Sequence, residues 1–308
     1  QLSYWGLFVY SFSRAEYGVA HELAGQLVAQ GERQQDMELL ALGHRMMAAT
    51  FYIWGDLAAA LEHIERGLAC PDLPLEEHRA IAEKQWINPR ATTLAFGAMV
   101  YSALGRKEEA WRSSQEALEL ARRIGHPHTT ATVLNYICVA CQLRWEARCA
   151  LDWSAQAISL AREHGFRASE IWATLIHGWA MGELGQARAG LALIRDGIAA
   201  WRGPGISAGL FHHDLGLMAE LHLKLGQPHE ALALLTEALE RAPTEGQHFY
   251  EAELLRLRGE ALRELGHEAE ARECLLRAIQ VARQQGARAF EQRAQDALGA
   301  LAPEHRAP

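Results

Sequence analysis

An internal repeat of about 40 residues limits the possible folds of this chain more than any other feature. A Leu-Gly pair recurs at positions 104–105, 184–185, 225–226 and 265–266, and Trp54-Gly55 is a variant of it. The flanking residues align Ala15 and Trp145 to the same place, although neither is a glycine. We therefore expect turns near residues 15, 55, 105, 145, 185, 226 and 266, which divide the chain into about seven units.

Small side chains occupy fixed columns on both sides of each turn. Five residues after the turn, every unit has Ala or Gly: Ala20, Ala60, Ala110, Ala150, Gly190, Ala231 and Ala271. Seven residues before the turn, the first unit has Phe8. The other six units have a small residue there: Ala48, Ala98, Cys138, Gly178, Ala219 and Gly259. Two antiparallel helices must approach to ~8–10 Å where they cross, and only small side chains permit this. Each unit is therefore predicted to be a helix pair.

This register of large and small residues resembles the tetratricopeptide repeat, and Pro243 stands where that repeat often ends. The resemblance covers residues 1–286 and implies an all-α, right-handed superhelical solenoid of about seven antiparallel helix pairs. HEAT-type solenoids also have repeats of ~40 residues, but they do not share this register. The amphipathic segment 288–301 predicts a C-terminal capping helix, so we expect one domain over 1–302 and a disordered tail at 303–308.

The second step of the repeat, from 55 to 105, is ten residues longer than most of the others. The additional residues lie within 71–89, where Pro74 followed by Leu75-Glu76-Glu77 predicts the start of a short helix. Insertions in repeat arrays often lie on the binding face. A surface loop with its own short helix is the simpler interpretation, and both stay open.

Composition argues against several classes of partner. The formal net charge is −8, and Arg and Lys are scattered beside Glu, whereas nucleic-acid binding needs a dense basic face. No stretch approaches the ~18 uncharged apolar residues of a membrane span. The cysteines are odd in number and irregular in spacing, which argues against a disulfide framework and favours a reducing compartment, so we expect a cytoplasmic protein. They are Cys70, Cys138, Cys141, Cys149 and Cys274.

Motifs for chemistry are weak. Cys138-x-x-Cys141 would need two further ligands to hold zinc, and the repeat register places both cysteines in core columns. Neither a His-Glu-x-x-His motif nor a phosphate-binding G-x-x-x-x-G-K-[ST] loop occurs. We therefore expect no catalytic residues, no metal and no cofactor.

The concave surface of such a solenoid is lined by the first helix of each repeat. Positions ten, six and three before each turn should face inward, where aromatic and amide groups would suit an extended peptide. For Trp172 and Trp179, packing between repeats is an equally good interpretation. The residues expected in this partner-binding groove are Arg45, Tyr52, Met99, Asn135, Gln142, Trp172, Trp179 and Glu220.

Longer strings resemble a narrower family, the C-terminal repeat region of bacterial multidomain signalling ATPases. These strings are 115–122, His126-Pro127, 178–180, 197–202 and 249–254. In that family a nucleotide cyclase or other output domain and an ATPase precede the repeats. The resemblance implies a non-catalytic sensor or regulatory module that binds a protein or peptide and communicates with upstream ATPase and output domains. The start of the chain without Met agrees with a piece of a longer protein.

An alternative function is self-assembly of the parent protein into a homo-oligomer. The first predicted helix is unusually apolar, as if another helix should cover it. Its apolar residues are Tyr4, Trp5, Leu7, Phe8, Val9 and Tyr10.

Overall fold

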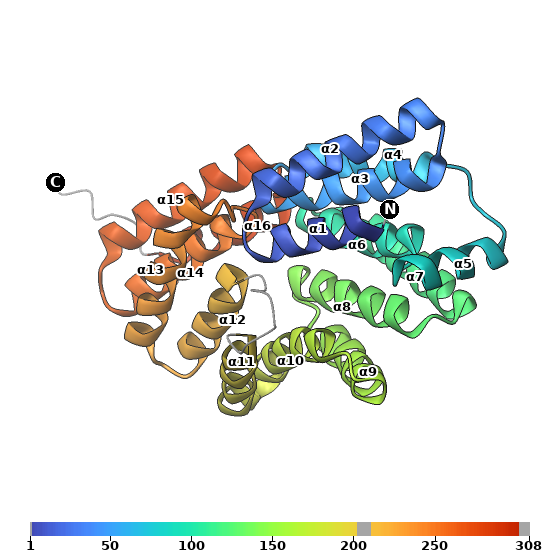
Figure 1. Cartoon of the computed structure of the whole chain (residues 1–308). Coiled ribbons are helices and arrows are strands. Elements are labelled where there is room, and N and C mark those ends of the chain that lie inside the picture. Colours follow the sequence, from blue (N-terminus) through green and yellow to red (C-terminus); the bar gives the residue numbers. More distant parts are fainter. Residues whose placement is uncertain (1, 202–210, 302–308) are drawn as a thin grey trace.

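The computed structural model describes residues 2–201 and 211–301, and every regular element within these ranges is a helix (Figure 1). The all-α prediction is therefore confirmed, and consecutive helices pack as antiparallel pairs. The pairs are α1 (Leu2–Ser13) with α2 (Tyr17–Gln34), α3 (Met37–Ile53) with α4 (Leu57–Ala69), α6 (Pro89–Ala103) with α7 (Lys107–Ile124), α8 (Pro127–Leu143) with α9 (Ala147–His164), α10 (Arg167–Met181) with α11 (Ala187–Trp201), α12 (Phe211–Lys224) with α13 (Pro228–Glu245), and α14 (Glu251–Glu264) with α15 (Glu268–Gln285).

The turn within each pair contains one residue with positive φ, at every position where the sequence predicts a turn. Five of these residues are glycines, namely Gly55, Gly105, Gly185, Gly226 and Gly266. Ala15 and Trp145 adopt the same left-handed conformation, with φ of 60° and 59°. Glycine adopts positive φ without steric cost, whereas these two side chains lose about 1 kcal/mol there. The tight turn is therefore imposed by the packing of the helix pair even where glycine is missing.

The small columns lie at the helix crossings. Ala20, Ala60 and Gly190, from the column after the turn, are fully buried, as are Ala48 and Ala98 from the column before it. Helices α10 and α11, which are connected by η1 (Gly182–Gln186), cross at very short distance. There a methyl group added to Gly190 would overlap the carbonyl oxygen of Gly178. The two backbones touch, which only glycine permits.

The insertion forms helix α5 (Leu75–Gln85), which begins directly after Pro74. Arg79 attaches α5 to the end of α7 by donating to the backbone carbonyls of Arg123 and Ile124, at 3.1 and 3.2 Å. Asn88 caps the next helix, because its side chain accepts a hydrogen bond from the backbone N–H of Ala91 at 3.0 Å. The insertion is therefore an ordered helix that packs on the end of α7.

The C-terminal helix α16 (Arg288–Gly299) covers the last repeat, and its buried face consists of Phe290, Ala294 and Ala297. The predicted tail at 303–308 lies outside the described residues. Within the described ranges, no helix combines the length and apolar character needed to cross a membrane.

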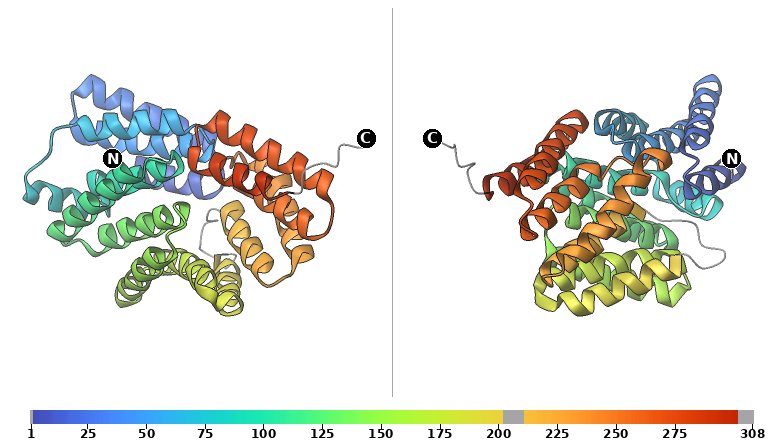
Figure 2. Two further views of the ribbon diagram at one scale, coloured as in Figure 1. Left: turned by 180° about the vertical axis from the view of Figure 1, so that it is seen from behind. Right: turned by 90° about the vertical axis from the view of Figure 1, so that its left-hand side faces the viewer.

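The superhelix curves until its two ends meet. In Figures 1 and 2 the blue helices of the first two repeats lie against the orange and red helices near the C-terminus. The backbone N–H groups of His248 and Phe249 donate to the carbonyl oxygen of Ile53, at 2.8 and 3.2 Å. The Phe249 ring packs on Tyr52 with centroids 4.8 Å apart. We call this contact region the closing seam, and its members are Tyr17, Tyr52, Ile53, Gln142 and residues 247–250.

Candidate functional site

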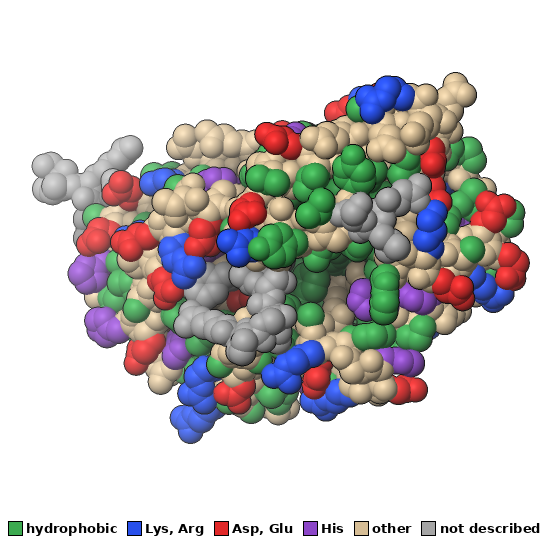
Figure 3. All heavy atoms as spheres, viewed as in Figure 1, with side chains coloured by type: hydrophobic (Ala, Val, Ile, Leu, Met, Phe, Trp, Pro, Cys, Tyr) green, Lys and Arg blue, Asp and Glu red, His purple; other side chains and the backbone are tan. Residues whose placement is uncertain are grey.

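An apolar cavity of about 240 Å³ lies on the concave side of the first three repeats. On the face shown in Figure 3 the surface is hollowed between the two halves of the chain, with apolar side chains around the hollow. Helix α1 contributes Trp5, Phe8 and Phe12 to the wall, and α10 and α11 contribute Trp172 and Trp201 from the other side. The cavity therefore contacts segments that are far apart in the sequence.

The repeat register explains why these side chains meet. Positions ten, six and three before the turn are Trp5, Val9 and Phe12 in the first repeat, and all three line the cavity. The same positions in the second repeat, Arg45, Ala49 and Tyr52, also line it. The cavity is thus the concave surface of the N-terminal repeats, enclosed by the curvature of the chain.

Arg45 is one of two charged groups in the wall, and Asp214 is the other. It is buried, with an exposed fraction of 3%. Its guanidinium lies 4.1 Å from the centroid of the Phe96 ring, and one terminal nitrogen donates to the Tyr136 hydroxyl at 2.6 Å. No carboxylate among the described residues pairs with it, and its Nε has no hydrogen-bond partner. Ring faces compensate part of the cost of burying this cation, but the second charge that usually accompanies a buried arginine is missing.

Two further donors in the wall lack partners. The hydroxyl of Tyr52 and the indole Nε1 of Trp201 are buried without a hydrogen bond. Burial raises the pKa of Tyr52, so its hydroxyl keeps its proton at neutral pH. Asp214 also lines the cavity, and burial raises the pKa of its carboxyl group, whose oxygen lies 3.5 Å from Nδ1 of His213.

Four of the eight residues expected in the partner groove meet at this cavity, namely Arg45, Tyr52, Met99 and Trp172. The other four lie elsewhere on the inner side. Gln142 belongs to the closing seam, where its Nε2 donates to the Tyr250 hydroxyl at 3.1 Å. All eight except Trp172 are buried.

The remaining three are Asn135, Trp179 and Glu220. Asn135 is buried and its Oδ1 has no partner. The Trp179 indole donates to a carboxylate oxygen of Glu220 at 2.8 Å. Burial, together with the nearby Glu183, raises the pKa of Glu220 to about 7. Glu220 also lines a polar pocket of about 510 Å³ that includes Arg256, whose own ion pairs are to Glu253 and Glu260 at 3.1 and 2.8 Å.

The aromatic residues of α1 are the part of the site that the groove prediction omitted. Trp5 and Phe12 follow the same spacing rule as the residues of the second repeat, so the signal was present. Asp214 and Trp201 carry no comparable signal, because neither lies at an inward column of its repeat.

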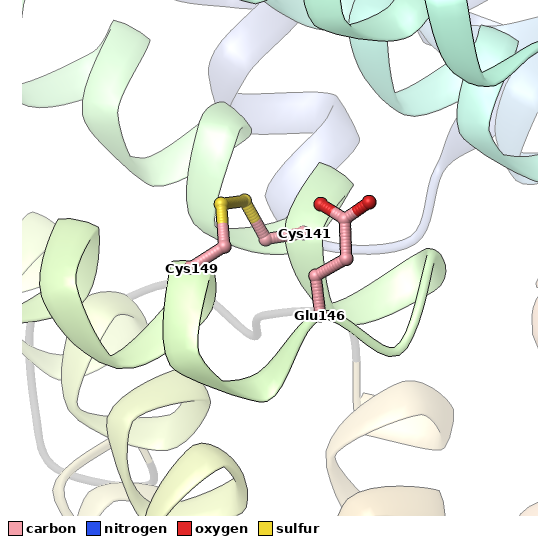
Figure 4. A group of neighbouring side chains, drawn as sticks. All are labelled: Cys141, Glu146 and Cys149. Carbon is pink, nitrogen blue, oxygen red and sulfur yellow. A yellow bond between two sulfur atoms is a disulfide. The ribbon is translucent and has the colours of Figure 1, made fainter.

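One pair of cysteines is bonded. The sulfur atoms of Cys141 and Cys149 are joined as a disulfide between α8 and α9, with Glu146 beside them (Figure 4). The irregular spacing argued against a framework of several disulfides, but it does not exclude one bond between neighbouring helices. Bonded sulfurs are not thiolate ligands, so Glu146 has no thiolate beside it with which to share a metal ion. Cys138 is fully buried, as its core column predicts, and burial raises the pKa of its thiol.

Comparisons with known proteins agree with this architecture. Residues 213–284 match the family model described as tetratricopeptide repeat. No curated protein sequence matches the chain at a significant level.

Among solved structures, a Rap protein complexed with competence and sporulation factor is similar, with 16% identity, a TM-score of 0.66, and coverage of 92% of this chain and 74% of that one. NprR in complex with its cognate peptide NprX has 14% identity and a TM-score of 0.60, and the match covers 97% of this chain and 82% of that one. Aspartyl phosphate phosphatase F from Bacillus subtilis has 16% identity, a TM-score of 0.61, and coverage of 92% and 70%. The chain therefore has the fold of tetratricopeptide-repeat proteins, and its residues 213–284 match that repeat family directly.

Proposed function

We propose that this chain is a non-catalytic sensor or regulatory module that binds a protein or peptide partner on its concave side. The observation that carries the proposal is the aromatic cavity of the first three repeats, with the buried Arg45 in its wall, which pairs with no carboxylate of the described residues. Two proteins of the same fold, the Rap protein and NprR, have peptide or factor complexes. The strings that resemble bacterial signalling ATPases support a place beside upstream ATPase and output domains in the cytoplasm.

Binding accounts for the cavity better than catalysis does. The described residues of its wall are mostly aromatic and aliphatic, with Arg45 and Asp214 as the charged groups. Such a wall can bury an apolar group and orient it through a few polar atoms, as binding sites for small ligands and side chains do. The fold alone does not decide the question, because aspartyl phosphate phosphatase F shares it.

A displayed library of random peptides with free C-termini tests the proposal. We expect selected peptides that bind the purified chain and bind Trp172→Ala at least tenfold more weakly, because Trp172 lines the cavity. Trp111→Ala is the matched control, since that indole is 62% exposed and lies on α7, outside the cavity. Circular dichroism would verify that both variants fold. Selected peptides that bind Trp172→Ala as well as the wild type would refute a site in the cavity.

Self-assembly is a second candidate, and the outer face of α1 supports it. Leu7 and Tyr10 have exposed fractions of 51% and 58%. Tyr10 stands five residues before its turn, and the residues of that column are fully buried in the other repeats: Thr50, Val100, Ala140, Ala180, Leu221 and Ala261. A second copy of the chain could cover this face. Light scattering across a concentration series tests this: a dimer that Tyr10→Glu dissociates supports it, and a monomer at every concentration excludes it.

A further inference from the structure

We infer that the cavity binds a compact apolar group bearing a carboxylate, with the carboxylate held by Arg45. The inference rests on the proposed function only in taking the cavity as a ligand site. It adds the chemical class of the ligand, which the repeat fold does not specify.

The first argument is charge. The Arg45 side chain is almost completely removed from water, yet no carboxylate of the described chain pairs with it. An unpaired buried cation is expensive, and the ring faces of Phe96 and Tyr136, with centroids at 4.1 and 5.2 Å, offset only part of that cost. A bound anion would supply the missing partner. Asp214 is the other charged group of the wall; burial raises the pKa of its carboxyl group, and one of its oxygens lies 3.5 Å from Nδ1 of His213.

The second argument is the kind of polar atom that is left without a partner. Three are donors: Nε of Arg45, the hydroxyl of Tyr52 and Nε1 of Trp201. A carboxylate is an acceptor only, with two oxygens and about four lone-pair sites, so it suits a wall whose unpartnered polar atoms are donors. A primary amide of the same shape carries N–H groups, which are donors like those of the wall and cannot accept a hydrogen bond from them.

The third argument is size. Ligand pockets for drug-sized molecules measure roughly 300–1,000 Å³, and this cavity measures about 240 Å³. It can hold one aromatic ring with a short acidic arm, but not several residues of an extended peptide. The aromatic wall, including Trp5, Phe12 and Trp172, suits a ring. The same chemistry occurs in a free aromatic acid and in a C-terminal phenylalanine of a peptide.

Isothermal titration with two matched pairs of probes tests the inference. The pairs are 3-phenylpropionate with 3-phenylpropionamide, and acetyl-Gly-Gly-Phe with its C-terminal amide. We expect the acid of at least one pair to bind at least tenfold more tightly than its amide. Preference within the first pair identifies a free acid as sufficient, and preference within the second pair alone identifies a peptide C-terminus.

Arg45→Met removes the cation while keeping an apolar side chain of similar length. We expect this variant to stay folded, to melt at the same or a higher temperature without ligand, and to bind acid and amide equally. Arg66→Met is the control, since Arg66 is exposed on α4 and should leave the preference unchanged. The inference is overturned if neither acid binds, if the amides bind as well as the acids, or if Arg45→Met keeps the preference. Library peptides that depend on Trp172 but bind equally well as C-terminal amides would overturn it while leaving the proposed function in place.

Discussion

The glycine contact between α10 and α11 gives the sharpest prediction about this fold. Gly190 and Gly178 touch through their backbones, and a methyl group on Gly190 would meet the Gly178 carbonyl rather than a flexible side chain. Gly25, in the middle of α2, has no atom within 4 Å of the place where a methyl group would stand. The same substitution, Gly to Ala, should therefore have opposite effects at these two helical positions.

The magnitudes follow from two opposing effects. Alanine is favoured over glycine in a helix by about 1 kcal/mol, which Gly25→Ala should gain almost completely. Overpacking of a filled site costs about 1–3 kcal/mol, and at Gly190 the upper end applies because two backbones must separate. Gly190→Ala should thus lose about 2 kcal/mol of stability. The two variants should differ by about 3 kcal/mol, which corresponds to roughly 6–12 °C in Tm for a chain of this size.

Far-UV circular dichroism during urea and thermal unfolding measures both variants against the wild type. Gly178→Ala approaches the same contact from the other helix, where its methyl group would lie 2.7 Å from the Gly190 carbonyl oxygen. It should be destabilised like Gly190→Ala. If Gly190→Ala and Gly25→Ala shift the unfolding midpoint in the same direction, the small columns do not mark helix crossings, and the reasoning from the repeat fails.

Three other properties of the structure can be tested directly. Glu220 has a pKa of about 7 in the folded protein, against an ordinary value of 4.5. Rising pH should therefore remove about 3 kcal/mol of the free energy of unfolding between about pH 4.5 and 7. Urea titrations at several pH values should show that Glu220→Gln lacks this dependence. Phe249→Ala should lower the free energy of unfolding by about 3–5 kcal/mol. It should also speed the hydrogen exchange of the amides that donate to Ile53, and unchanged exchange would mean that the seam does not depend on this ring. Alkylation of the denatured, unreduced protein should spare Cys141 and Cys149, and mass spectrometry that finds them modified would contradict the disulfide. The cysteines modified without reduction should be Cys70, Cys138 and Cys274.

The fold could be predicted because a helix crossing leaves a local trace in the sequence. Each crossing needs a small residue at a fixed distance from the turn, and the array repeats that requirement along the chain. The register even located the turns at Ala15 and Trp145, where the usual glycine is missing. The same columns identified the inward positions, which is why Arg45 and Tyr52 reach the cavity.

The closure of the superhelix could not be predicted in this way. Tyr52 and Phe249 are almost 200 positions apart, and their contact occurs once, so no column of the repeat records it. The total curvature that brings them together is a sum of small rotations from repeat to repeat. For the same reason the repeat register does not predict the contact of Gln142 with Tyr250.

Closure also links the candidate site to the shape of the molecule. Tyr52 lines the cavity, and its ring packs on Phe249 across the closing seam. A ligand in the cavity therefore contacts a residue whose position depends on the seam. Such a ligand stabilises the closed superhelix only by as much as it binds that form better than an open one. At a ligand concentration 100 times the Kd, a ligand specific for the closed form would supply about 2.7 kcal/mol, which is comparable to the predicted cost of Phe249→Ala. Ligand binding at Arg45 should therefore change the shape of the molecule most clearly in a variant whose closing seam is destabilised.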